Sequence, residues 1–113
     1  MKVTNLRNGK ELSNNVIVAD SLLKRMKGLL GKSEMSVGEA LLIKPCMSIH
    51  TFGMRFPIDV VFLNKRSKVI ALIKNLQPNR ITRLYLKATS VLELPAGVLE
   101  AKDTKVGDEI EIA

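Results

Sequence analysis

Short apolar runs, some alternating with polar residues and some uninterrupted, recur along the whole chain. Runs of roughly four to eight such residues, bounded by Gly, Pro, Asn or Asp, are typical of β-strands. We expect extended segments at residues 2–6, 14–19, 40–44, 58–64, 68–76, 80–86, 88–97 and 105–113. About seven of these should be true strands, because 80–86 is the weakest of the set.

Two turn signals connect these segments into hairpins. Asn8-Gly9 is a type I′ turn signal and predicts that 2–6 pairs with 14–19. The polar turn at 64–68 joins two apolar runs, which makes the hairpin of 58–64 with 68–76 the strongest in the chain.

One helix interrupts the strands at about residues 21–30. Its apolar residues recur at spacings of three and four and form one stripe, with basic residues on the other side. The stripe consists of Leu22, Leu23, Met26, Leu29 and Leu30. Asp20 or Ser21 can cap the start and Gly31 can end it. Residues 98–103 add a single helical turn. The pattern predicts a mostly β, α+β fold, barrel-like or sandwich-like.

Length and composition fit a single domain spanning residues 1–113. The chain is 46% hydrophobic and 26% charged, so a disordered chain is excluded. With no Trp, one Tyr and three Phe, a surface that stacks nucleic-acid bases has few rings to use.

The net charge of +7 is unevenly distributed, because residues 1–92 carry +11 and residues 93–113 carry −4. A basic body attracts polyanions and acidic partners, although a basic surface also serves solubility. Binding of RNA or another polyanion is a further alternative, and it would use Lys24, Arg25, Lys27, Lys65, Arg66 and Lys68.

The single Cys46 excludes an internal disulfide and fits a reducing compartment. The N-terminal residues lack the apolar core of a signal peptide, and no apolar run approaches the roughly 20 residues that span a bilayer. We therefore expect a soluble, cytoplasmic protein without a membrane span. The sequence gives no indication of its oligomeric state.

The rarest polar groups gather just before the apolar run at 58–64. Cys46 and His50 are unique in the chain, and Ser48, Thr51 and Asp59 lie beside them. A catalytic thiolate needs a neighbouring base, but residues four apart on a strand lie roughly 13 Å apart. Plain packing of a small Cys and a half-buried His is the alternative. A triad of Ser48, His50 and Asp59 lacks the G-x-S-x-G elbow.

A metal site could be assembled on paper from Cys46, His50, Asp59 and Glu93. No Cys-x-x-Cys or His-Glu-x-x-His spacing supports it, and a structural zinc site needs about four fixed ligands. The sequence therefore predicts no metal and no cofactor.

Two carboxylates, Asp59 and Glu93, stand inside apolar strands. A buried carboxylate must be paired, reach water or shift its pKa. One interpretation is structural pairing with Arg25, Lys44 or Arg55. The other is a pocket with both carboxylates at its rim. The residues leave both open.

The segments that contain these carboxylates resemble a known family. The chain is similar to the uncharacterised family "domain of unknown function 192" in its Arg-x-x-Gly-Leu segment (residues 25–29), its Met-x-x-Pro-Ile-Asp segment (54–59) and its Leu-Glu-Leu-x-x-Gly segment (92–97). The resemblance implies a compact β-rich fold with a short helix and no established activity. It marks Arg25, Asp59 and Glu93 as motif positions, and we infer a charged cluster joining them. Many relatives carry a Trp-Met-Lys-Asn-like segment where this chain has residues 49–55 instead.

We predict a small binding or accessory module rather than an enzyme, with a small ligand or a protein as its partner. Its polar pocket would lie near residues 46–59 and 93. The candidate binding residues are Arg25, Ser48, His50, Thr51, Asp59 and Glu93. A small hydrolase or thiol-dependent enzyme with Cys46 and His50 as its catalytic residues is the alternative.

Overall fold

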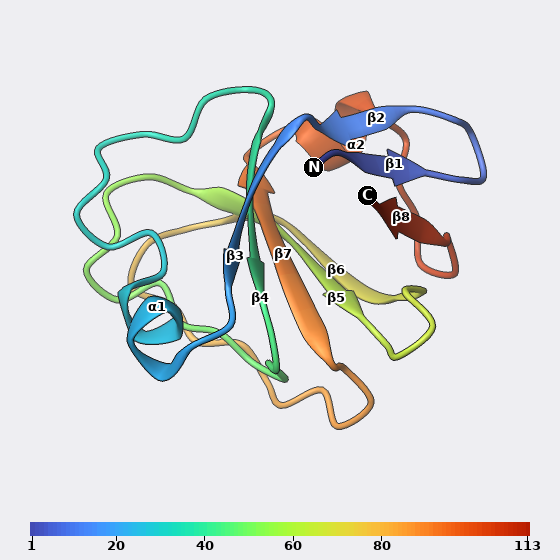
Figure 1. Cartoon of the computed structure of the whole chain (residues 1–113). Helices are drawn as coiled ribbons and strands as arrows, with labels where there is room; N and C mark the ends of the chain where they lie inside the picture. The colour runs from blue at the N-terminus through green and yellow to red at the C-terminus, as the bar shows by residue number, and fades with distance from the viewer.

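A computed structural model describes residues 1–113 and shows two β-sheets packed in a sandwich-like arrangement (Figure 1). The small sheet has the order β2-β1-β8 and the large sheet the order β3-β4-β7-β5-β6. The elements are β1 Val3–Asn5, β2 Glu11–Ser13, β3 Asn15–Ala19, α1 Leu22–Lys27, β4 Glu39–Ile43, β5 Ile58–Leu63, β6 Val69–Leu76, β7 Ser90–Pro95, α2 Val98–Ala101 and β8 Ile110–Ile112. The predicted mostly β, α+β class is confirmed, and of the two predicted forms the fold is the sandwich-like one.

The two faces of the large sheet carry two separate halves of the core. One face packs against the small sheet and α2, with Val61, Leu92 and Leu99 fully buried there. The other face carries Leu41, Val60 and Phe62. Strand β5 is buried along its whole length, which explains why its residues are apolar apart from Asp59.

A layer of connecting segments covers the second face. It consists of residues 21–30 with α1, residues 44–57 between β4 and β5, and residues 77–89 between β6 and β7. Leu29, Ile49 and Ala88, one from each segment, are buried in the same core cluster. We call these three segments the covering layer.

The N-terminal hairpin differs from the expected one. Its turn lies where Asn8-Gly9 predicts it, with Gly9 at a φ of 72°. However, β1 pairs with β2, whereas residues 15–19 form β3 in the large sheet, parallel to β4. The prediction that 2–6 pairs with 14–19 was wrong, because the short strand β2 takes that place. The hairpin of β5 with β6 is confirmed.

The segment 80–86 is not a strand. It crosses the covered face and binds the neighbouring connection, where the amide of Thr82 donates to the carbonyl of Ile49 and that of Tyr85 to Met47. Its apolar residues alternate because Tyr85 turns inward onto Phe62 while Leu84 and Leu86 point to solvent. Ile81 forms only an isolated antiparallel bridge with His50, so the period of two arose here without a strand in either sheet.

Helix α1 begins as predicted and ends early. The Ser21 side chain accepts a hydrogen bond from the amide of Lys24, and Gly28 ends the helix at a φ of 48°. None of its six residues is buried, so most of the apolar stripe stays exposed and only Leu29, beyond the helix, joins the core. No helix is long and apolar enough to cross a membrane.

Candidate functional site

Asp59 and Glu93 lie on adjacent strands but point to opposite faces of the large sheet. Glu93 on β7 stands opposite Val60 on β5, while Asp59 stands opposite Leu94. Directly opposed residues share a face and neighbours along a strand alternate. Asp59 therefore points toward the small sheet and α2, and Glu93 toward the covering layer. The inferred charged cluster that joins both to Arg25 is not formed.

The Asp59 carboxylate is fully buried and fully occupied. One oxygen accepts the amide of Asn75 at 2.8 Å, and the other accepts those of Gly97 at 3.1 Å and Leu99 at 2.9 Å. It thereby holds the start of α2 and the left-handed residue Asn75 of β6, whose φ is 56°. These contacts make Asp59 a structural carboxylate that no ligand can reach without breaking them.

The Glu93 carboxyl has no such partners. The residue is only 4% exposed and forms no ion pair, and burial alone raises its pKa from 4.5 to about 7. Every side-chain nitrogen or oxygen that is inaccessible to solvent has a hydrogen-bond partner. The Glu93 oxygens have no partner, so they remain accessible, and they face the space above the sheet.

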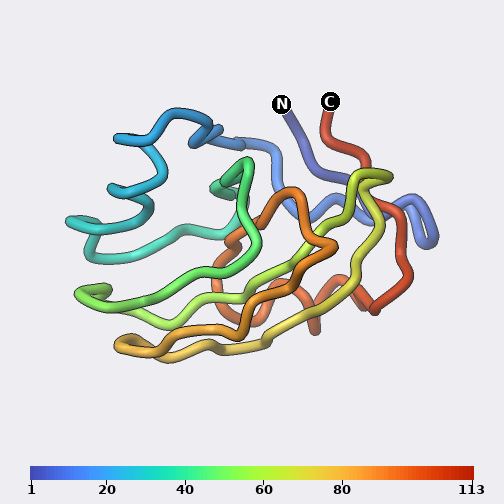
Figure 2. The backbone as a smooth tube through the Cα atoms, turned by 90° about the horizontal axis from the view of Figure 1, so that it is seen from below, coloured from blue at the N-terminus to red at the C-terminus, as the bar shows by residue number.

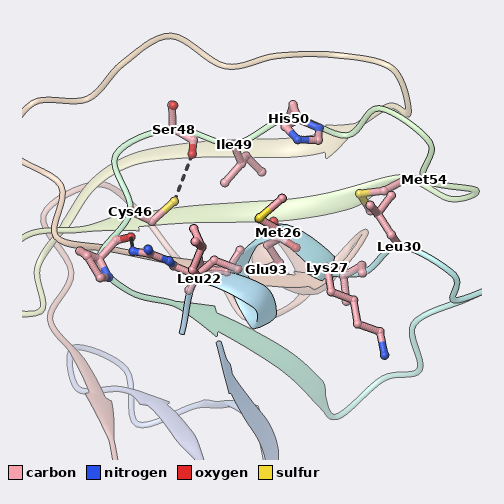
Figure 3. Close-up of a pocket in the computed structure, with 15 residues that line it drawn as sticks. Leu22, Met26, Lys27, Leu30, Cys46, Ser48, Ile49, His50, Met54 and Glu93 are labelled. Atoms are coloured by element: carbon pink, nitrogen blue, oxygen red, sulfur yellow. Dashed lines mark hydrogen bonds between the residues drawn. The ribbon is translucent and has the colours of Figure 1, made fainter. Parts of the chain in front are cut away.

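That space is a pocket of about 340 Å³ between α1 and the connection 44–57 (Figure 3). Its walls are mainly apolar. They include Leu22, Met26 and Leu30 from the helical segment and Ile49 and Met54 from the connection, with Met26 lying between Ile49 and Glu93. The Lys27 side chain points away from the pocket. The result is an apolar pocket with one carboxyl at its base.

Arg25 holds the two walls of the pocket together. Its guanidinium donates to the carbonyl of Pro45 at 3.2 Å, which bridges α1 to the connection. It also lines the pocket and places a positive charge there. It makes no ion pair with Glu93, and neither do Lys44 and Arg55, the other two expected partners.

Cys46 lines the same pocket with an unactivated thiol. Its Sγ donates to the carbonyl of Ser48 at 3.1 Å. Burial raises its pKa, and the nearby Glu93 raises it further, while Arg25 and the backbone at Ser48 act in the opposite direction. Thiolate nucleophiles require a lowered pKa, so these surroundings oppose nucleophilic chemistry.

His50 also lines the pocket, but it contacts Phe52 rather than Cys46. Its Nδ1 accepts the amide of Phe52 at 3.3 Å, and its ring stacks on Phe52 with centroids 5.3 Å apart. Thr51 is fully buried, donates to the carbonyl of Gln77 at 2.7 Å and accepts the amide of Arg80 at 2.9 Å. Thr51 thus ties two parts of the covering layer together and does not line the pocket.

Of the six predicted binding residues, the structure brings four to one pocket: Arg25, Ser48, His50 and Glu93. Thr51 and Asp59 lie outside it. The sequence reasoning missed the apolar walls, although the α1 stripe was the available signal. No group of three or more potential metal-ligating side chains comes together.

Comparison with known proteins identifies the family. Residues 3–112 match DUF192, an uncharacterized ACR. The chain is 34% identical over 112 residues to the UPF0127 protein PF1050 of Pyrococcus furiosus, covering 95% of this chain and 94% of that protein. It is 31% identical over 111 residues to a UPF0127 protein of Thermococcus sibiricus, covering 95% and 71%. The chain belongs to this family.

Two crystal structures show the same fold. A protein of unknown function from Novosphingobium aromaticivorans has a TM-score of 0.85 at 21% identity, covering 98% of this chain and 82% of that one. A protein from Sinorhizobium meliloti, provisionally described as a transcription regulator, has a TM-score of 0.84 at 20% identity, covering 97% and 89%. At these identities the likeness concerns the fold alone.

Proposed function

We propose that this protein is a binding module that takes a small, mainly apolar ligand, or one side chain of a protein partner, into the pocket between α1 and residues 44–57. The observation that carries the proposal is the unpartnered Glu93 carboxyl at the base of an apolar pocket. A buried carboxyl without a partner is costly, and a bound donor removes that cost.

The chemistry of the pocket narrows the ligand class. A volume of about 340 Å³ is at the lower end of ordinary ligand pockets, so the bound group is compact. Glu93 with a pKa of about 7 binds both a neutral donor, such as a hydroxyl or amide, and an ammonium group. A carboxylate ligand is disfavoured next to Glu93, and the one Arg that lines the pocket, Arg25, already donates to the Pro45 carbonyl.

The arrangement supports binding over catalysis. A thiol enzyme needs Cys46 activated by a base, but Cys46 bonds to a backbone carbonyl and His50 to a backbone amide. A Ser48–His50–Asp59 triad is not assembled either, because Asp59 points to the opposite face of the sheet. The residues therefore offer polar contacts without a paired nucleophile and base.

The proposal is tested by following backbone amide shifts by NMR while benzyl alcohol, benzylamine or benzoate is titrated in. The two donors should shift residues of α1 and 45–54, and Glu93→Leu should weaken their binding about tenfold, the size of one lost charge-assisted hydrogen bond. Glu39→Gln is the matched control, because Glu39 is also on a strand but outside this pocket. Tighter binding of benzoate, or equal binding by Glu93→Leu, would contradict the proposal.

A further inference from the structure

The covering layer carries the positive charge of the protein. Its three segments, residues 21–30, 44–57 and 77–89, contain eight of the eighteen Lys and Arg residues and none of the eleven Asp and Glu residues. These segments therefore carry +8, and the rest of the chain carries −1. None of the eight cations forms an ion pair. The adjoining carboxylates include Asp20, just before the first segment, Glu39, which lines a neighbouring pocket with Lys24 and Lys27, and Glu93, buried beneath the layer.

Large aliphatic side chains project from the same layer. Six of them are at least half exposed, three in α1 and three in the last segment: Leu22, Leu23, Met26, Ile81, Leu84 and Leu86. They alternate with the exposed cations Lys24, Lys27, Arg80, Arg83 and Lys87. Single exposed apolar residues are ordinary, but six interleaved with unpaired cations on one layer are not.

The three segments lie side by side. Arg25 of α1 donates to the carbonyl of Pro45, and the amide of Thr82 donates to Ile49 in the middle segment. Figure 2 shows them in succession across the sheet, from blue through green to yellow-orange. Because their inward residues pack on the sheet, the exposed cations and Leu23, Ile81, Leu84 and Leu86 occupy the outer side of the layer, while Leu22 and Met26 border the mouth of the Glu93 pocket.

We propose that the covering layer docks on an anionic membrane surface. Lys and Arg side chains attract acidic headgroups, and the aliphatic side chains between them enter the headgroup–acyl boundary. This surface shares Leu22 and Met26 with the walls of the Glu93 pocket, but the residues that test it, Leu23 and Leu86, lie outside that pocket. Docking places the mouth of that pocket, beside α1, on the lipid-facing side.

The surface fits lipid better than other polyanions. Surfaces that bind single-stranded nucleic acid use aromatic stacking, but of the chain's Phe and Tyr residues only Phe52 is exposed. A protein interface has a closely packed core depleted of charged residues, whereas here the exposed aliphatic side chains alternate with cations. A bilayer requires only that cations and apolar side chains face the same side.

The test measures co-sedimentation of the full chain with vesicles of phosphatidylcholine alone and with about 30% phosphatidylserine. The wild type should bind the anionic vesicles at least about tenfold more tightly, and raising salt from about 0.1 to 0.5 M should weaken this binding. The double variant Leu23→Ser/Leu86→Ser should lose about tenfold or more in affinity for them. These side chains are 79% and 76% exposed, so folding should be unaffected, which thermal unfolding checks.

The matched control is Leu6→Ser/Val106→Ser, two exposed apolar residues at the small sheet on the far side of the molecule. It should bind vesicles like the wild type. Equal binding of neutral and anionic vesicles, an equal loss in both double variants, or no vesicle binding would overturn the proposal. In the last case, binding of a single-stranded RNA or of polyglutamate would assign the layer to that partner class instead.

Discussion

Asp59 on β5 and Glu93 on β7 lie on neighbouring strands, one residue out of register with each other. Their carboxyl groups have opposite surroundings. Asp59 accepts three backbone N–H groups on the face covered by the small sheet and α2. Glu93 accepts none on the face beneath the covering layer and has a pKa near 7. Both stand in apolar strands and both are almost completely buried. The difference shows that burial alone does not determine the role of a carboxylate. The number of hydrogen-bond donors around it does.

The largest expected effect is on the Asp59 side of this comparison. Asp59→Ala should lower the free energy of unfolding by about 3 kcal/mol or more, because three amides of the interior lose their acceptor at about 1 kcal/mol or more each. Urea denaturation at pH 7 measures the loss. A loss below about 1 kcal/mol would mean that water or a rearranged α2 replaces the carboxylate. Asp59→Asn keeps the side-chain volume, so its free energy of unfolding should lie between those of the wild type and Asp59→Ala.

The corresponding substitution of the other carboxyl, Glu93→Gln, should make the protein more stable than the wild type at high pH. Glu93 has a folded pKa of about 7 and an unfolded value near 4.5, so the folded state binds the extra proton between them. The free energy of unfolding should fall as pH rises from about 4.5 to 7, by up to about 3 kcal/mol, and then level off. Glu93→Gln should lack this decline and be the more stable protein at pH 8.

Urea midpoints between pH 4.5 and 8.5 measure that difference. Glu39→Gln is the control, since Lys32 holds the pKa of Glu39 below its usual value and the variant should lose a little stability toward neutral pH. A pH profile of Glu93→Gln parallel to that of the wild type would show that the Glu93 carboxyl is ionised and solvated in the folded protein.

The smallest expected effect concerns the Cys46 thiol in the pocket. Because burial raises its pKa, the alkylation rate should reach half its maximum at a higher pH in the folded protein than in the unfolded chain, and His50→Ala should leave that pH unchanged. The rate of alkylation from pH 6 to 10, with the urea-unfolded chain as reference, measures it. A low pKa that rises in His50→Ala would reveal a Cys–His pair and would revive the thiol-enzyme alternative.

The sequence by itself determined most of the secondary structure. The β5–β6 hairpin, the Ser21 cap of α1 and the turn at Asn8-Gly9 depend on neighbouring residues, so periodicity and turn chemistry found them. The alternation of residues 80–86 suggested a strand, but it reflects the packing of a crossing loop on the sheet. Strand β2 has only three residues and left no periodic signal.

Only the tertiary structure decided which carboxylate is structural and which lines a pocket. The register of β5 against β7 places Asp59 and Glu93 on opposite faces, and the donors for Asp59 come from residues 16 to 40 positions away. The pocket likewise requires α1 to lie across the connection 44–57. Pairing register and crossing connections join distant residues, and local sequence patterns do not encode which side chains then meet.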